Sequence, residues 1–271
     1  MKLNEFKNIA DSLSPAPEQP VVFIGHGNPM NVITDNPYRK IWASLGERLV
    51  KPNAVLCISA HWYTAGSFVT MNEFPRTIHD FGGFPPELYQ EQYPAAGAPE
   101  LAAEVVEKVK TANIAGSTDW GLDHGTWCVL KPMFPDGDIP VFQLSIDHTK
   151  PPQFHYDLGK ELTFLRSRGV LILGSGNIVH NLRMASWDDS TPYDWAVEFN
   201  ETAKQKLTER DDTALVEYAQ FGEPARLSIP TEEHYLPLLY ALGASEGKAE
   251  TEIFNDAFDL ASISMMSVIL N

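Results

Sequence analysis

The sequence VVFIGHG at residues 21–27 joins an uninterrupted apolar run to a histidine that lies between two glycines. An apolar run rich in β-branched residues is typical of a strand that is buried on both faces of a parallel sheet. Three further runs have the same character, at residues 54–59, 141–146 and 170–173. The sequence therefore predicts a sheet whose central strands are parallel.

Amphipathic stretches alternate with these apolar runs. Apolar residues recur at helical spacing in four of them: residues 36–50, 98–110, 153–168 and 193–209. We expect Gly169 to end the third helix and Thr231 to cap a further helix over residues 232–242. The tail, residues 260–270, fits either a last strand or a buried helix. The predicted class is α/β, as a single three-layer domain with a largely parallel or mixed central sheet flanked by helices.

Composition and charge exclude several classes of protein. Residues 1–20 end in a Pro-rich segment that predicts an N-terminal arm, whereas residues 21–271 contain no linker or repeat and predict one domain. The 36 acidic and 20 basic residues give a formal charge of -16, which opposes binding to nucleic acid and to anionic membranes. No stretch is typical of a signal peptide or a membrane span. The two cysteines, Cys57 and Cys128, are too few for a disulfide framework, so we expect a cytoplasmic protein.

Three histidines follow the predicted strands. His26 comes directly after the first strand, His61 lies in SAHW just beyond the second, and His180 lies a few residues past a third. Ligands of open α/β sheets bind outside the carboxyl ends of the strands, so these imidazoles are placed to converge on one metal ion. His234, in PTEEHYLP, is a fourth candidate ligand. A single histidine after a strand is more often a hydrogen-bonding turn residue, and no local metal motif such as HExxH occurs.

The other histidines have more than one interpretation. His124, in WGLDHGTW, fits either proton transfer at the rim of an active site or packing on the neighbouring tryptophans. His79 lies in an aromatic and glycine-rich segment that fits a pocket wall or a tight surface turn. His148 and His155 lie around a Lys-Pro-Pro turn, and we expect both to be solvated.

Aromatic residues gather around the candidate histidines in the sequence. They are Trp62, Tyr63, Phe81, Phe84 and Tyr235. They favour an apolar pocket for an aromatic substrate, although aromatic residues beside loops often only pack. The glycine turns at 25–27 and 174–176 match neither GxGxxG nor GxxxxGK(S/T), the two common phosphate-binding motifs. No GxSxG elbow occurs to support serine hydrolysis.

Six separated segments carry a family resemblance. They are GHGNPMN at 25–31, SAHW at 59–62, TIHDFGGFP at 77–85, WGLDHGTW at 120–127, SGNIVHNLR at 175–183 and PTEEHYLPLLYALGA at 230–244. In this order they closely resemble the bacterial 4,5-DOPA extradiol dioxygenase family of LigB-type, or class III, enzymes. The resemblance implies a LigB-type catalytic domain over 21–271. It also implies the use of O₂ to open the ring of a catechol such as L-DOPA, by 4,5-cleavage to a semialdehyde.

The same resemblance implies roles for individual residues. His26, His61 and His234 match metal positions, and His180 matches a fourth position that serves as an acid/base and, in this branch, also as a possible ligand. His124 matches a pocket histidine that contacts substrate or oxygen. Related protocatechuate enzymes have a glutamate where His234 falls, so this chain departs from their two-histidine, one-carboxylate set.

One divalent metal ion per chain follows from the resemblance. An all-imidazole site suits zinc as well as iron, and nitrogen ligands bind Zn²⁺ more tightly than Fe²⁺, so Zn²⁺ is expected in the purified protein. Because Zn²⁺ is redox-inert, Fe²⁺ is expected for activity.

The expected partners are a small aromatic diol and O₂, and the chain is expected to be a monomer or a small homo-oligomer. Further candidates for substrate binding are His79, Trp62, Tyr235 and Arg183. Arg183 is placed either to pair with a substrate carboxylate or to be an ordinary surface cation. Two alternative functions are a zinc-dependent hydrolase that uses a metal-bound hydroxide and a non-enzymatic binding protein of the LigB-type fold.

Overall fold

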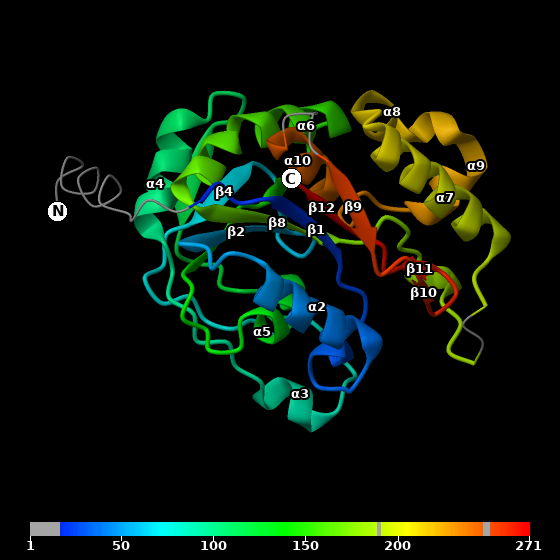
Figure 1. Cartoon of the computed structure of the whole chain (residues 1–271), viewed down its shortest axis with the longest axis horizontal. Helices are drawn as coiled ribbons and strands as arrows, with labels where there is room; N and C mark the ends of the chain where they lie inside the picture. Colours follow the sequence, from blue (N-terminus) through cyan, green and yellow to red (C-terminus); the bar gives the residue numbers. More distant parts are fainter. Residues whose placement is uncertain (1–16, 189–190, 246–249) are drawn as a thin grey trace.

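A six-stranded mixed sheet forms the centre of the computed structural model, which describes residues 17–188, 191–245 and 250–271 (Figure 1). Most of the predicted N-terminal arm lies outside these described residues. The strands, in spatial order, are β6 (Val141–Gln143), β2 (Ala54–Ser59), β8 (Val170–Gly176), β1 (Val21–Gly25), β12 (Ser267–Leu270) and β9 (Thr251–Phe254). The first four run parallel, whereas β12 and β9 add an antiparallel edge.

Helices cover both faces of this sheet (Figure 1). On one face lie α4 (Pro99–Lys108), α6 (Pro152–Glu161), α7 (Asp194–Glu209), α8 (Asp212–Val216), α9 (Gly222–Ser228) and α10 (Leu236–Ala244). On the other lie α2 (Pro37–Arg48), α3 (Pro86–Gln90) and α5 (His124–Met133). These three layers confirm the predicted α/β architecture.

Short elements complete the chain. The short 3₁₀ helices are η1 (Pro29–Val32), η2 (Thr163–Arg168), η3 (Leu182–Met184) and η4 (Tyr218–Phe221). Outside the main sheet lie the paired strands β3 (Tyr63–Thr64) with β7 (Ile146–Asp147), β4 (Ser67–Thr70) with β5 (Ile114–Ser117), and β10 (Phe258–Asp259) with β11 (Ile263–Ser264).

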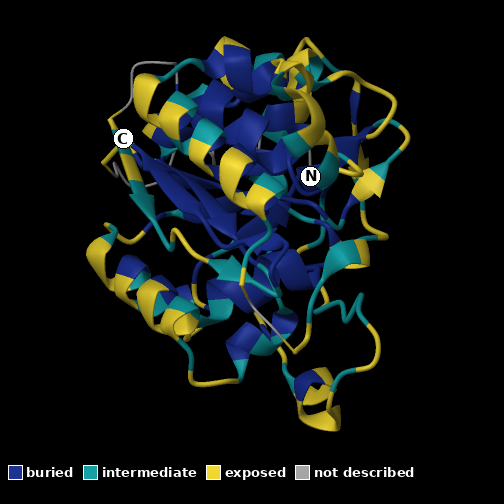
Figure 2. Cartoon of the chain, turned by 90° about the vertical axis from the view of Figure 1, so that its right-hand side faces the viewer, coloured by how far each residue is buried: buried dark blue, intermediate teal, exposed yellow. Residues whose placement is uncertain are grey.

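Burial of the central strands on both faces explains their continuous apolar runs. Along β1, Val21 and Phe23 pack into the core that α6 and α10 cover, whereas Val22 and Ile24 pack into the core that α2 and α5 cover. All five residues of β1 are buried, and Figure 2 shows the sheet buried between helices whose outer faces are exposed. Within the described residues, no helix has the length and apolar character needed to cross a membrane.

The helix boundaries differ from the predictions at two places. The predicted helix 153–168 is divided at Leu162 into α6 and η2, which Gly169 ends in a left-handed conformation at φ 74°, as predicted. The predicted cap Thr231 was wrong, because α10 begins only at Leu236 and the Thr231 hydroxyl bonds the Glu233 carboxylate instead. The tail, residues 260–270, was expected to be either a strand or a buried helix, and it forms the strands β11 and β12.

The prediction that His155 is solvated was also wrong, because this residue is fully buried. Its Nδ1 lies 3.0 Å from the hydroxyl of Tyr240, a residue of α10. The contact of α6 with α10 is close, since a Cβ on Gly159 would lie 2.4 Å from the carbonyl oxygen of Tyr240. The other histidine of this region, His148, is exposed as expected.

Candidate metal centre

Two histidines leave the sheet at the carboxyl ends of parallel strands. His26 directly follows β1, and its backbone N–H donates to the carbonyl of Gly176 at the end of β8 (3.0 Å). His61 lies two residues past β2, where the backbone N–H of Ala60 donates to the carbonyl of Ser175 (3.0 Å). Because β8 lies between β1 and β2 in the sheet, its end positions both loops.

His234 reaches the same edge from the turn ahead of α10, and His180 reaches it from the segment that follows β8. The backbone N–H of Asn177 donates to the carbonyl of His234 (2.8 Å), just ahead of α10. A Cβ on Gly176 would lie 2.1 Å from that carbonyl oxygen, so this approach requires glycine. His180 lies three residues beyond Asn177, and its backbone N–H donates to the carbonyl of Ser228 (2.9 Å).

A cavity of about 260 Å³ opens at this edge, and five histidines line it. They are His26, His61, His124, His180 and His234. His124 reaches the cavity as the first residue of α5, which Asp123 caps by accepting from the Thr126 N–H. The apolar part of the lining is formed by Phe81, Phe84, Leu182, Trp187, Leu260 and Ile263. An apolar cavity with a few convergent polar groups is suited to a small, flat ligand.

The rings of His26, His61 and His234 form a nearly equilateral triangle. Their centroids lie 5.1 Å apart for His26 and His61, and 5.3 Å apart for each of the two pairs with His234. Imidazoles that bind one ion at about 2.0–2.1 Å and at tetrahedral angles have centroids roughly 5.2 Å apart. The Nε2 atoms of His26 and His61 lie 3.2 Å apart, close to the edge of roughly 3.4 Å that such a site requires. The triangle therefore has the dimensions of a three-histidine metal site.

The hydrogen bonds of His26 fix which of its nitrogens faces the other rings. Its Nδ1 lies 3.0 Å from the Ser175 hydroxyl oxygen, and that hydroxyl donates its own proton to the carbonyl of Gly125. The hydroxyl oxygen therefore accepts a hydrogen bond from the Nδ1–H group of His26. The neutral ring then has its lone pair on Nε2, which points at His61.

Carboxylates lie beside Nδ1 of the other two rings of the triangle. Oδ2 of Asp80 lies 3.3 Å from Nδ1 of His61, and Oε1 of Glu233 lies 3.2 Å from Nδ1 of His234. An acceptor on Nδ1 fixes the proton there and leaves Nε2 as the metal-binding atom. The Nε2 lone pairs of His26 and His61 face each other, and a cation between them satisfies both. The donor set fits a divalent ion of the zinc or iron type.

Burial keeps these imidazoles neutral, which is the form that binds a metal. Burial, followed by the neighbouring His124, lowers the pKa of His61 to about 3. Burial also lowers the pKa of His180 to about 4. The pKa values of His26 and His234 are lowered well below the ordinary value by burial first and by the surrounding histidines second. At neutral pH these four rings are therefore uncharged.

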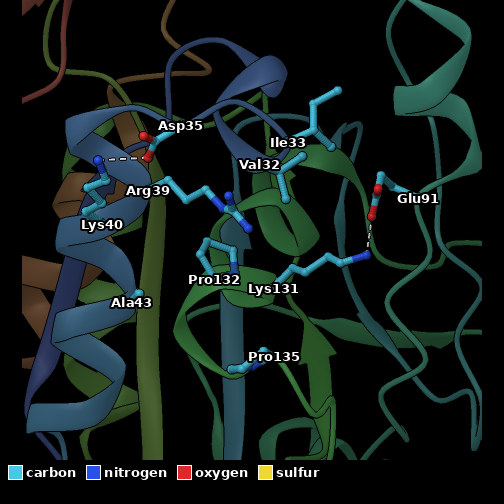
Figure 3. Close-up of a pocket in the computed structure, with 10 residues that line it drawn as sticks. All are labelled: Val32, Ile33, Asp35, Arg39, Lys40, Ala43, Glu91, Lys131, Pro132 and Pro135. Carbon is cyan, nitrogen blue, oxygen red and sulfur yellow. Dashed lines mark hydrogen bonds and ion pairs between the residues drawn. The ribbon is translucent and has the colours of Figure 1, made fainter.

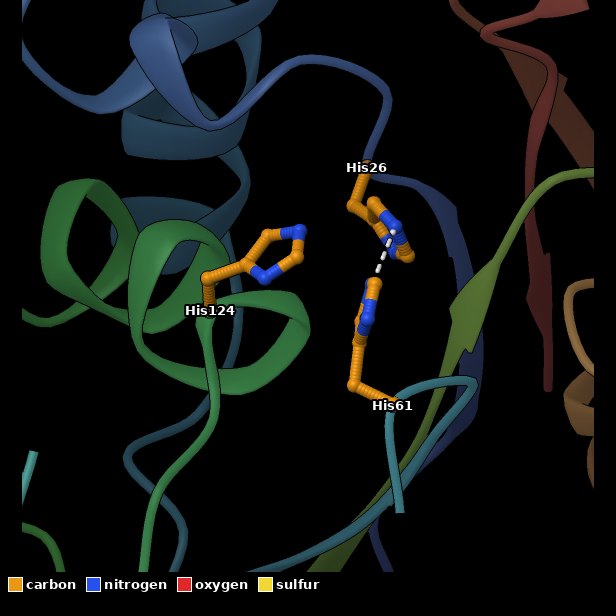
Figure 4. A group of neighbouring side chains, drawn as sticks. All are labelled: His26, His61 and His124. Atoms are coloured by element: carbon orange, nitrogen blue, oxygen red, sulfur yellow. Dashed lines mark hydrogen bonds between the residues drawn. The ribbon is translucent and has the colours of Figure 1, made fainter. Parts of the chain in front are cut away.

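His180 and His124 lie against members of the triangle. The ring of His180 stacks on His234 with centroids 3.5 Å apart and planes inclined by 11°. An ion in the plane of one stacked ring lies outside the plane of the other, so the two rings are poorly placed to bind the same ion. His124 lies 3.8 Å from the ring of His61, and His26, His61 and His124 each offer a nitrogen within 4.8 Å of the others (Figure 4).

A second group of possible ligands overlaps the triangle. His180, Glu233 and His234 also offer ligand atoms within 4.8 Å of one another. The ring-centroid spacing of His26, His61 and His234 favours the triangle as the site of a shared ion.

The four predicted substrate-binding residues do not line the cavity within the described residues. Trp62 is buried and stacks in parallel on a second tryptophan. The Tyr235 side chain is buried in the core, and its hydroxyl donates to the carbonyl of Leu215 in α8. His79 bonds the carbonyl that ends α3 and packs among aromatic rings, and Arg183 is exposed on η3.

Sequence reasoning missed several residues that line the cavity. Trp187 is 74% exposed yet lines the cavity, together with Leu182 at its mouth. Asp80 lines it as well and contacts two histidines. The only signal for Asp80 was its place in the TIHDFGGFP segment, which lies beside the WGLDHGTW segment through a bridge between Thr77 and Leu122.

A larger cavity of about 770 Å³ lies elsewhere, beside η1, α2 and the end of α5 (Figure 3). Its charged lining residues are largely paired with one another. Lys40 pairs with Asp35 and Lys131 pairs with Glu91, while Arg39 extends between them. No histidine lines this cavity, so its size does not make it the chemical site.

Comparisons with known proteins agree with this geometry. A family model described as the catalytic LigB subunit of aromatic ring-opening dioxygenase matches residues 20–271. The chain is 46% identical to a 4,5-DOPA dioxygenase extradiol of Escherichia coli (strain K12), over 96% of this chain and 97% of the relative. It is 38% identical to the protein of the same name from Beta vulgaris, over 88% and 91%. The crystal structure of an uncharacterized protein from Escherichia coli K12 has a TM-score of 0.82 at 43% identity, over 93% of this chain and 100% of that one.

Proposed function

This chain belongs to the LigB family of aromatic ring-opening dioxygenases and is an extradiol dioxygenase, and we propose that it opens the ring of L-DOPA or a related catechol. The reaction is a 4,5-cleavage with O₂ that yields a ring-opened semialdehyde. The names of the bacterial and plant relatives support this substrate. The observation that carries the proposal is the triangle of His26, His61 and His234 at the floor of an apolar cavity.

One divalent ion per chain is proposed to be held by Nε2 of His26, His61 and His234. When bound, Fe²⁺ would supply the one-electron chemistry that O₂ requires, which redox-inert Zn²⁺ cannot supply. Zn²⁺ is nevertheless proposed as the ion found after purification, because an all-nitrogen site prefers it. The choice between the two metals is tested by metal analysis and by activity after loading with each.

The chain's own residues are proposed to move protons and to position the ring. His180 is neutral, as its lowered pKa of about 4 implies, and it accepts a proton from a catechol hydroxyl and later returns it. His124 hydrogen-bonds the substrate or oxygen from the opposite side of the cavity. Phe81 and Phe84, whose rings lie 5.3 Å apart, pack against the catechol ring and exclude water.

Reconstitution tests the reaction. Metal-free protein is loaded anaerobically with Fe²⁺, mixed with L-DOPA and air, and followed by oxygen uptake and by mass spectrometry of the yellow product. We expect uptake of one O₂ for each ring opened, and no turnover with Zn²⁺ alone. If fully iron-loaded protein consumes no oxygen with any member of a catechol panel, the proposed reaction is wrong. His148→Ala changes an exposed histidine outside the cavity and serves as the control.

Three further assignments are also proposed. Residues 21–271 form the catalytic domain, which the family match over residues 20–271 supports. A reducing cytoplasmic location is supported by Cys57 and Cys128, which are both buried as free thiols. The protein is proposed to be a monomer or a small homo-oligomer, which sedimentation of the metal-loaded chain measures.

A further inference from the structure

The carboxylate of Asp80 contacts two histidines of the cavity at once. Its Oδ1 accepts from the backbone N–H of His124 (2.9 Å). Its Oδ2 lies 3.1 Å from Nδ1 of His124 and 3.3 Å from Nδ1 of His61. The Asp80 side chain is only 17% exposed, so water competes weakly for these contacts.

We propose that Asp80 is a positioning residue that fixes both the metal ligand His61 and the cavity histidine His124 through one carboxylate oxygen. The inference rests on the proposed metal site and adds a residue to it. A carboxylate oxygen has two lone pairs, so Oδ2 lies within reach of both Nδ1 atoms, and its charge favours a proton on each of them. Neither contact is an aligned hydrogen bond in this structure, and Nδ1 of His124 is buried without another hydrogen-bond partner. Both rings are then held in the tautomer whose lone pair is on Nε2.

With Asp80 positioning both rings, His61 and His124 have different functions. Nε2 of His61 lies 3.2 Å from Nε2 of His26 and is available to the ion. Nε2 of His124 becomes a hydrogen-bond acceptor inside the cavity, where it faces a catechol hydroxyl. Because the two rings are only 3.8 Å apart, a shift of Asp80 moves the ligand and the substrate contact together.

Asp123, the neighbouring buried carboxylate, does not share this role. Its oxygens accept from Ser59, Gln143 and Thr126, and it also caps α5. Asp123 therefore caps α5 through Thr126, whereas Asp80 contributes the contact with the His124 backbone N–H, which the amide oxygen of an Asp80→Asn variant can keep. This division indicates that Asp80 can be changed without unfolding the helix that carries His124.

The first variant is Asp80→Asn. Its amide oxygen can still accept from the His124 backbone, but its NH₂ group then faces two Nδ1–H groups as a third donor. We expect the affinity for Zn²⁺, measured by competition with a chromophoric chelator, to fall by about 10- to 100-fold. In ¹⁵N-histidine spectra of the metal-free protein, the tautomer signals of His61 and His124 should change, whereas those of His26 should not.

Asp80→Ala is the second variant, and it should weaken Zn²⁺ binding at least as much because it removes both acceptor oxygens. Asp147→Asn is the matched control, since Asp147 is also buried and accepts a backbone N–H and a hydroxyl from Thr149 without contacting these histidines. Wild-type affinity and unchanged tautomers in either Asp80 variant would overturn the inference. Zn²⁺ affinity and tautomers are measured without substrate, so they remain decisive even if no catechol is cleaved.

Discussion

His180 and His234 lie with their rings stacked 3.5 Å apart, and in the proposed site one is the proton carrier and the other a metal ligand. His180→Ala should leave metal binding close to one ion per chain, because the triangle of His26, His61 and His234 is intact. Turnover should fall by about 10²- to 10⁴-fold, the usual contribution of a general acid or base. Metal analysis together with single-turnover rates distinguishes the two roles.

His234→Ala is the matched comparison at the residue scale. It removes one corner of the triangle, so both metal content and turnover should fall. If His180→Ala loses the ion as readily as His234→Ala does, then His180 is a ligand and the stacked pair binds in another way.

The end of β8 and the start of α10 form the contact that positions His234. Gly176→Ala would place a Cβ 2.1 Å from the carbonyl oxygen of His234, so the segment ahead of α10 must move away from the sheet. We expect a loss of about 1–3 kcal/mol in the free energy of unfolding, as for other overpacked sites. Zn²⁺ affinity should fall as well, because His234 moves relative to His26.

Gly82→Ala is the control for this element. Gly82 lies between two cavity aromatics, and an added Cβ there meets nothing within 4 Å. Denaturant unfolding and zinc titration should both match the wild-type protein. An equal loss in the two variants would mean that the contact of β8 with His234 does not set the site.

Sequence patterns predicted the central strands well because those strands are buried on both faces. Each gives an apolar run, as β1 and β8 do. The pattern failed at α5, where Gly125 and Pro132 interrupt the helical signal and the segment resembled a loop. It also failed at the start of α10, since residues 232–235 form turns before Leu236.

The candidate site was predictable only in part. His26 and His61 follow strands directly, so their meeting at the sheet edge follows from the topology. Asp80 was not predictable, because its contacts depend on the pairing of two loops that no periodic pattern marks. Tyr235 was assigned to the substrate from its place beside His234, but its side chain points into the core.

At the scale of the whole molecule, buried neutral histidines make stability depend on pH. Burial lowers the pKa values of five of them: His26, His61, His155, His180 and His234. Their ordinary pKa is about 6.5, so unfolding takes up protons as the pH falls below that value. The metal-free protein should be most stable above pH ~6.5 and should lose stability between pH ~6.5 and ~4, by up to about 1.4 kcal/mol per pH unit for each histidine.

Urea unfolding of the metal-free protein at a series of pH values measures this loss. His155→Gln should flatten the dependence, because it removes one such group far from the metal site. The carboxyl of Asp123 has the opposite effect on the pH dependence of stability. Because burial raises its pKa, its contribution to stability falls as the pH rises. Stability that is unchanged or greater at pH 5 than at pH 7 would contradict the expectation.

The ligands of the triangle come from opposite ends of the chain, since His26 follows the first strand and His234 precedes the last long helix. A ribosome releases His26 and His61 long before it has synthesised His234, so a nascent chain offers an incomplete coordination sphere. Stable capture of the ion therefore has to wait until translation has passed α10 and the chain has closed on itself. Conversely, a bound ion would link a segment that is synthesised early to one that is synthesised late. Metal release during unfolding would therefore indicate that these two segments have separated.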